Sequence, residues 1–146
     1  MDTERKQQLE QFIQVLGLKE FHNLLVLDQA LTHSSYANEN KASHGYYNER
    51  LEFLGDAILD LVVGEYLFLH YPNMPEGELS KARASVVSET PLASVCAKFH
   101  MGDYILLGKG ELATGGRTRP SIMADAFEAV VGAIYIDSSY EEARKF

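Results

Sequence analysis

Acidic side chains recur at helical spacing in one stretch of this 146-residue chain. Glu49, Glu52 and Asp56 follow one another three and four residues apart, and Asp60 lies one turn further on. On a helical wheel these four acids fall within an arc of about 80°. Like charges at this spacing repel one another, and Arg50 is the only basic residue among them. A divalent cation bound by the acids would offset that repulsion.

A second stretch of the chain carries the same pattern. Asp125 and Glu128 are three residues apart, and small residues at 126, 129, 132 and 133 lie beside them. Small side chains allow another helix to approach closely, so two such helices could bring four or more acids around one point. Oxygen ligands without nearby His or Cys favour Mg²⁺ or Mn²⁺ over Zn²⁺. The residues alone leave a second interpretation open, namely two unrelated acidic faces in contact with water.

Helical periodicity of apolar residues along most of the chain predicts the elements that carry these acids, and an all-α fold. The predicted helices cover residues 3–16, 24–36, 46–70, 76–87, 91 onward, 119–136 and a short segment from 138. Between them we expect a polar loop at 37–45, a turn at 71–75 and a glycine-rich loop at 102–116. Length and the absence of linkers or repeats predict one domain over residues 1–146.

The helix predicted at 46–70 has one clear core face, made of Leu51, Leu54, Ile58, Leu61 and Val62. Apolar residues also border the acidic stripe, so we expect that side of the helix to be covered as well. Glycine in a helix interior costs about 1 kcal/mol relative to alanine. Gly55, in the middle of this helix, therefore predicts close approach of another backbone.

Composition limits the possible classes of function. Residues of the apolar types make up 46% of the chain and charged residues 23%, which is typical of a soluble globular protein. The single cysteine, Cys96, favours a reducing compartment, and no apolar run is long enough to span a membrane. We therefore expect a cytoplasmic protein without a membrane partner. The formal net charge of −8 argues at first against nucleic acid as a partner.

Four segments, in the right order, resemble the motifs of the ribonuclease III family. The segment at 48–61, Asn-Glu-Arg-Leu-Glu-Phe-Leu-Gly-Asp-Ala-Ile-Leu-Asp-Leu, is similar to its signature sequence. Residues 30–36 resemble an earlier motif of the family. Residues 76–80 with 83–84 resemble the turn and helix after the signature, and 124–135 its second acidic motif. The resemblance covers about residues 9–146 and implies the all-α fold of a ribonuclease III endonuclease domain of the bacterial type.

The resemblance also implies an activity: Mg²⁺-dependent hydrolysis of double-stranded RNA, leaving 5′-phosphate and 3′-hydroxyl ends with a short 3′ overhang. Mn²⁺ is a possible substitute for Mg²⁺. Four acids would be catalytic and would hold the metal: Glu52, Asp56, Asp125 and Glu128. Glu49 and Glu76 match two auxiliary acids of the family. The cellular role implied is the processing of RNA, such as ribosomal RNA precursors and messenger RNA.

Partners follow from the same resemblance. The family forms homodimers through the signature helix, with the aromatic residue at Phe53 entering a socket on the second copy. For contact with RNA phosphates we single out Lys109, Arg117 and Arg119. A double-stranded-RNA-binding domain usually follows the point where this sequence stops, and we expect that it is missing from this chain.

Two other classes of function compete with this interpretation. A non-cleaving RNA-binding or ribosome-associated relative would have lost carboxylates of the acidic motifs, but all of them are present here. A helical di-iron oxidase would need Glu-x-x-His pairs, which neither acidic helix contains. We interpret His33, in the early motif, as a packed residue rather than a catalytic one.

The negative charge then has another explanation. Six of the acids belong to the proposed site, which accounts for six of the eight excess negative charges. The remainder of the chain is close to neutral. We therefore expect weak, salt-sensitive binding of RNA by this domain alone.

Overall fold

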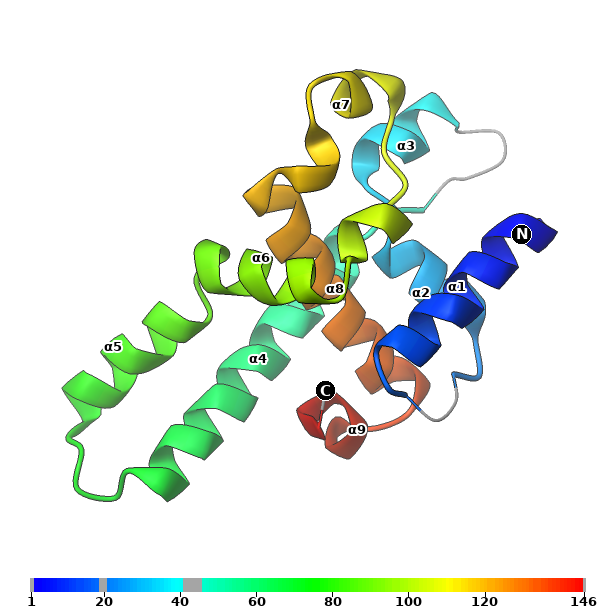
Figure 1. The fold of residues 1–146 in the computed structure, drawn as a ribbon. Helices are drawn as coiled ribbons and strands as arrows, with labels where there is room; N and C mark the ends of the chain where they lie inside the picture. The colour runs from blue at the N-terminus through cyan, green and yellow to red at the C-terminus, as the bar shows by residue number, and fades with distance from the viewer. Residues whose placement is uncertain (1, 19–20, 41–45, 146) are drawn as a thin grey trace.

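The structure is a computed structural model that describes residues 2–18, 21–40 and 46–145, without the side chains of residues 140, 142 and 145 (Figure 1). Its α-helices are α1 (Thr3–Val15), α2 (Leu24–Ala30), α3 (Ser34–Glu39), α4 (Glu49–His70), α5 (Glu76–Val86), α6 (Glu89–Lys98), α7 (Lys109–Ala113), α8 (Pro120–Asp137) and α9 (Tyr140–Lys145). Two short 3₁₀ helices, η1 (Met101–Tyr104) and η2 (Gly116–Thr118), flank α7. In the described ranges the only β-type pairing is an isolated bridge between Thr32 and Leu106. The prediction of an all-α fold is confirmed.

Helix α8 is the central element of the core. It packs against α4, α6, α2 and α9, which surround it in Figure 1. Pro120 occupies its first turn, where the missing N–H would have no helical partner. From residue 122 to 134 its side chains are buried, except for the half-buried Asp125 and Glu128. Although α8 is strongly apolar, no helix in the described part of the chain has the length and hydropathy needed to cross a bilayer.

Helix α4 has two halves in different surroundings. Its first half lies against α8 and buries Leu51, Gly55 and Ile58. Its second half forms a hairpin with α5 that projects from the body of the molecule, and α5 itself has no buried residue. Leu61, predicted as a core residue, is 56% exposed because α8 has already diverged from α4 at that turn. That part of the predicted core face is wrong.

The prediction of one helix over 24–36 is also wrong. The chain leaves the helix at Leu31, where the backbone pairs with a distant segment. The N–H of Leu106 donates to the carbonyl of Leu31 at 2.8 Å, and the N–H of His33 donates to the carbonyl of Leu106 at 3.0 Å. A new short helix, α3, then begins at Ser34 and takes up part of the predicted loop; residues 41–45 of that loop lie outside the described residues.

A buried ion pair fixes α1 to the body. The Nε of Arg5 donates to Asp28 at 2.6 Å, and another guanidinium N–H donates to the carbonyl of Tyr104 at 2.8 Å. Tyr46, just before α4, donates its hydroxyl to the same carboxylate. Burial and the neighbouring Asp28 raise the pKa of Tyr46, which keeps the phenol protonated as a donor. This network ties the N-terminus to the segment that leads into α4.

Candidate active site

Helices α4 and α8 cross with their backbones in contact. A Cβ on Gly55 would lie 1.7 Å from the carbonyl oxygen of Glu128, and a Cβ on Gly132 would lie 2.5 Å from that of Leu51. Both distances are too short for any side chain, so only glycine fits at these two positions. The close approach predicted for Gly55 is confirmed.

This crossing brings the four central acids together in two pairs, each of which joins the helices. Glu52 of α4 and Asp125 of α8 share a side-chain hydrogen bond. Asp56 of α4 and Glu128 of α8 share another. The sequence predicted that two acidic helices meet, and the alternative of two unrelated solvated faces is excluded by these pairs.

Burial and crowded negative charge raise the pKa values of these acids. The pKa of Glu52 rises to about 7, first because the carboxyl is removed from water and then because Asp125 carries a like charge beside it. The pKa of Glu128 rises to about 8 through burial and the charge of Asp56. Burial also raises the pKa of Asp125. At neutral pH, protons shared between these carboxylates neutralise part of their negative charge. A bound divalent cation could neutralise that charge instead.

The donor set of the site suits a hard divalent cation. Its side chains offer only carboxylate oxygens, which Mg²⁺ and Mn²⁺ prefer. In the described residues no three His, Cys, Asp or Glu side chains yet converge closely enough to enclose a metal ion. The assignment of these acids as metal ligands therefore stays a prediction, supported by the pairing of acids across α4 and α8.

The two auxiliary acids lie in different places. Glu49 begins α4 and is exposed, and its negative charge contributes to the raised pKa of both Glu52 and Asp125, so it borders the cluster. Glu76 begins α5, at the projecting end of the hairpin (Figure 1). The stretch of α4 from residue 56 to 70 corresponds to about 20 Å of helix, and this length lies between the cluster and the end of the hairpin where Glu76 begins α5.

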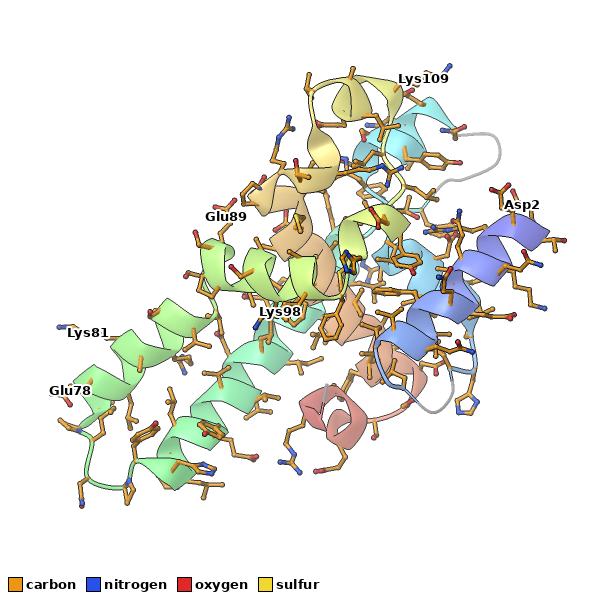
Figure 2. The ribbon with its side chains drawn as sticks, viewed as in Figure 1. Asp2, Glu78, Lys81, Glu89, Lys98 and Lys109 are labelled. Atoms are coloured by element: carbon orange, nitrogen blue, oxygen red, sulfur yellow. The ribbon has the colours of Figure 1, made fainter. Side chains whose placement is uncertain are left out.

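Two further residues act on Asp125 that the sequence did not mark as part of the site. The negative charge of Glu89, at the start of α6, raises the pKa of Asp125. His33, which precedes α3, lowers the same pKa. His33 lies in the segment at 30–36 that resembles a motif of the family, so the sequence contained a signal that could have marked it as part of the site. Glu89 has no local signal, because only the packing of α6 against α8 brings it near; Figure 2 shows it at the beginning of α6.

Of the three basic residues expected to contact RNA, Arg117 has an internal structural role. Its guanidinium donates to the carbonyls of Gly102 and Ile105, at 2.8 and 2.9 Å. A Cβ on Gly102 would lie 2.5 Å from the carbonyl oxygen of Arg117, so the two segments touch. Arg117 thereby holds the glycine-rich segment against the start of α8.

The other two basic residues differ from each other: Arg119 is bonded within the chain, whereas Lys109 is exposed. Arg119 pairs with Glu111 and also donates to Thr114, which closes the turn between α7 and η2. Lys109 is exposed at the start of α7, on the opposite side of the molecule from the tip of the hairpin (Figure 2). Among these three, the structure leaves Lys109 in the position most open to a partner.

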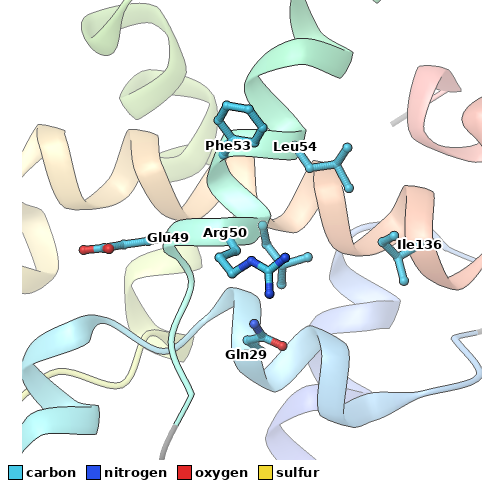
Figure 3. A pocket seen from close by; sticks show the side chains of 7 residues that line it. Gln29, Glu49, Arg50, Phe53, Leu54 and Ile136 are labelled. Atoms are coloured by element: carbon cyan, nitrogen blue, oxygen red, sulfur yellow. The ribbon is translucent and has the colours of Figure 1, made fainter.

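Phe53 lies immediately beside the acid cluster in sequence but points away from the core. Its side chain is 81% exposed, although apolar flanks of this helix were expected to be covered. A cavity of about 630 Å³ opens next to it, and Figure 3 shows Phe53, Leu54 and Arg50 of α4 around this cavity with Ile136 of α8. Within one chain, nothing among the described residues covers this aromatic ring.

The family to which these features point is shown by comparison with known proteins. A family model described as ribonuclease-III-like matches residues 23–146. The chain belongs to the ribonuclease-III-like family. Ribonuclease 3 of Enterococcus faecalis is 53% identical over 126 residues, which are 86% of this chain and 55% of that protein. Ribonuclease 3 of Borreliella burgdorferi is 50% identical over 146 residues, which are 99% of this chain and 58% of that protein.

Solved structures agree with the family on the fold. A nuclease domain of ribonuclease III from Campylobacter jejuni superposes with a TM-score of 0.86 at 44% identity, covering 94% of this chain and 91% of that one. Dicer from Pichia stipitis shares the fold alone, with a TM-score of 0.60 at 23% identity over 82% of this chain and 48% of that one. This ribonuclease-III-like chain spans a little more than half the length of the curated relatives it matches.

Proposed function

We propose that this domain is a double-strand-specific endoribonuclease, a hydrolase that cleaves phosphodiester bonds of double-stranded RNA with Mg²⁺ or, as a substitute, Mn²⁺. The observation that carries the proposal is the glycine-lined crossing of α4 and α8, where four carboxylates pair across two helices. Identity of about 50% to proteins named Ribonuclease 3 supports it. The products would be 5′-phosphate and 3′-hydroxyl ends with a short 3′ overhang.

Each acid has a role in this proposal. Glu52, Asp125 and Glu128 would hold the cation directly or through water, and Asp56 would ligate it or orient a water molecule beside it. A divalent cation, when bound, stabilises negative charge at phosphorus and makes water more acidic. The carboxylates of the chain would fix the position of that charge, and a carboxylate oxygen not bound to the cation would accept the proton that the attacking water loses. Glu49, at the border of the cluster, would help to place the scissile strand or a second ion.

A homodimer would complete the site and produce the staggered cut. Two offset sites related by a two-fold axis cut the two strands at offset positions. A protruding ring, Phe53, and a cavity lie side by side on this surface. In a symmetric dimer, Phe53 of each copy would therefore enter the cavity of the other. For the Campylobacter jejuni nuclease domain, a region involved in dimer formation is described.

A dimer would also explain how Glu76 can act at a cleavage site. About 20 Å of helix lies between the cluster of its own chain and the end of the hairpin that carries this acid, so a cleavage site on a second copy is the one it would serve. As an auxiliary acid at the partner's site it would act on RNA or on a second ion.

Contact with RNA would rely on shape and backbone, because the base edges of an RNA duplex are poorly accessible. Lys109 is the first candidate for a phosphate contact, and Arg117 and Arg119 would contribute by holding their segment in place. A basic double-stranded-RNA-binding domain would supply further attraction in a longer protein. We propose processing of ribosomal and messenger RNA in the cytoplasm as the cellular role.

A cleavage assay tests this function directly. Long duplex RNA is incubated at low salt with the wild-type chain or with Glu128→Gln, with and without Mg²⁺. We expect cleavage by the wild-type chain only with the metal, and a loss on the order of a hundredfold or more in the variant, which removes one charge from the site. Asp60→Asn, one turn beyond the cluster on α4, is the matched control and should cut normally.

The assay also separates the proposed function from its alternatives. Intact duplex RNA with the wild-type chain and Mg²⁺ would favour the non-cleaving RNA-binding relative. Equal cutting by Glu128→Gln would show that the assignment of the site is wrong even if the activity is right.

A further inference from the structure

Asn48 immediately precedes α4 but does not cap this helix in the usual way. The residue before a helix commonly has an extended backbone and a side chain that accepts an N–H of the first turn. Asn48 has φ −89° and ψ −2°, and its side chain makes no such hydrogen bond to the described first turn of α4. It is only 4% exposed, although asparagine is mostly a surface residue. A good capping residue is therefore buried here in another role.

Asn48 binds the end of α2 with both its side chain and its backbone. Its Nδ2 donates to the carbonyl of Ala30 at 3.2 Å, and its N–H donates to the carbonyl of Thr32 at 3.0 Å. Ala30 is the last residue of α2, where carbonyls have no helical partner. The carbonyl between them, that of Leu31, accepts from the N–H of Leu106. Three successive carbonyls are thus satisfied, two of them by Asn48.

The segment around Asn48 is held to the same helix. Tyr46 donates its hydroxyl to Asp28 of α2 at 2.5 Å. Residues 46–48 therefore run along the end of α2. The carbonyl of Asn48 then accepts the N–H of Glu52 at 2.8 Å, which is the first helical hydrogen bond of α4. Helix α4 consequently starts from a fixed point on α2.

Glu49 depends on this fixed point because it lies outside the crossing of α4 with α8. The close backbone contact with α8 begins at Leu51, whose carbonyl oxygen would lie 2.5 Å from a Cβ on Gly132. Glu49 precedes that contact, and its exposed side chain points away from Arg50 in Figure 3. The backbone of Glu49 is thus held between the crossing on one side and Asn48 on the other.

We propose that Asn48 is a positioning residue: its amide donates to the carbonyl of Ala30 and thereby fixes the first turn of α4, which holds Glu49 beside the acid cluster. This inference rests on the proposed function of that cluster. Asparagine suits the role because it combines a donor of sufficient reach with no charge. Its effect on cleavage would be exerted through Glu49.

Two substitutions remove the donor and keep the ability to cap a helix. Asn48→Asp keeps the shape of the side chain, but a carboxylate cannot donate to the carbonyl of Ala30. Asn48→Ser is uncharged and ends one atom earlier. If Asn48 were an ordinary N-cap, both variants would be as stable as the wild-type chain. Because a buried carbonyl loses its partner, we expect the unfolding temperature of both to fall by roughly 5 °C or more.

The first readout of positioning needs neither metal nor RNA. Amide hydrogen exchange is followed by NMR in EDTA for residues 52–54, in the first turns of α4, and for residues 129–131, buried in α8. In Asn48→Ser we expect the ratio of the first rates to the second to rise about tenfold, because local fraying is added to any loss of global stability. A general loss of stability would not raise this ratio.

The second readout is a double-mutant cycle on the cleavage of duplex RNA, well below the unfolding temperatures. We expect Asn48→Ser to lower kcat/KM about tenfold, since misplacement of a group at the site is costly. In the Glu49→Gln background, Asn48→Ser should lower kcat/KM no further but should still lower the unfolding temperature. Ile13→Val, in the core part of α1, is the control that loses stability and should cleave normally.

Each contrary result is decisive. Additive losses of kcat/KM would show that Asn48 does not act through Glu49, and normal cleavage by Glu49→Gln would remove the residue on which it is proposed to act. An unchanged exchange ratio in a chain that cuts RNA would overturn this inference alone and reduce Asn48 to a structural residue. A wild-type chain that leaves duplex RNA intact with Mg²⁺ would overturn the proposed function, and with it the role of Asn48 in cleavage.

Discussion

The two halves of α4 have similar apolar sequences and opposite surroundings. In the first half, Leu51, Gly55 and Ile58 are buried against α8. In the second half, Phe68 and Leu69 are mostly exposed on a hairpin whose other helix buries nothing. The contrast teaches that burial along this helix depends on what crosses it. One face of the first half is covered by α8 within the chain, although Phe53 on another face stays exposed, whereas the second half leaves Phe68 and Leu69 exposed on the hairpin.

The largest expected effect comes from a substitution in the buried first half of α4, at Gly55. Gly55→Leu places a side chain where a Cβ alone would lie 1.7 Å from the carbonyl oxygen of Glu128. We expect a loss above about 4 kcal/mol, which is most of the stability of a domain at the lower end of the ordinary range of about 5–15 kcal/mol. Circular dichroism and urea unfolding measure it.

Gly64→Ala is the matched control on the same helix. Its Cβ would have only ordinary contacts, 3.8 Å or more from the side chain of Arg83. Alanine should leave stability unchanged or raise it by up to about 1 kcal/mol, since it favours helix. Comparable losses in Gly55→Leu and Gly64→Ala would show that α4 does not pack in two distinct ways.

Phe53→Glu tests whether the exposed surface of α4 serves a second copy. A buried aromatic at the centre of an interface is commonly worth about 2 kcal/mol or more, so we expect dimer dissociation to rise on the order of thirtyfold. Sedimentation equilibrium measures it. Leu25→Glu, on α2, removes an exposed apolar side chain elsewhere and should leave the oligomeric state unchanged. Dimerisation unaffected by Phe53→Glu would exclude the proposed socket.

The stability of the metal-free chain should depend on pH through the acid cluster. The pKa values of Glu52 and Glu128, about 7 and 8 in the folded chain, lie above the ordinary value of 4.5. Between these values the folded chain binds more protons than the unfolded chain, so the free energy of unfolding falls as pH rises. We expect the unfolding temperature in EDTA to be a few degrees lower near pH 8.5 than near pH 5.5.

The control for this pH dependence is Glu128→Gln, which removes one of the raised groups. Its unfolding temperature should change less with pH, and saturating Mg²⁺ should flatten the profile of the wild-type chain. A wild-type profile that rises toward pH 8.5 would contradict the crowded-acid description of the site.

The smallest effect is expected in the hairpin. Phe68→Ser removes a side chain that is 69% exposed, so at concentrations where the chain is monomeric the free energy of unfolding should change by less than about 0.5 kcal/mol. Ile58→Ala, ten residues earlier on the buried face of α4, should cost about 2 kcal/mol or more. Equal losses in the two variants would mean that the hairpin is packed within its own chain.

Several features of the fold could be predicted because their signals are local. Helical periodicity located α4, α5 and α8 to within a few residues, and glycine in a helix interior marked the crossing at Gly55. The long helix predicted at 24–36 failed because the hydrogen bonds of Leu31 and His33 go to Leu106, far along the chain. Periodicity carries no information about such a partner.

For the site, the sequence predicted the kind of chemistry and the structure determined the arrangement. Carboxylates at three- and four-residue spacing, with few basic residues near them, suggested a hard cation but left two solvated acidic faces as an alternative. The tertiary structure decided which acids pair across the two helices, that the charges of Glu89 and His33 act on the pKa of Asp125, and that Glu76 lies at the far end of the hairpin. It also engaged Arg117 and Arg119 in hydrogen bonds within their own chain. The reason is physical: spacing fixes which side chains share a face, whereas only the packing of faces fixes what each side chain meets.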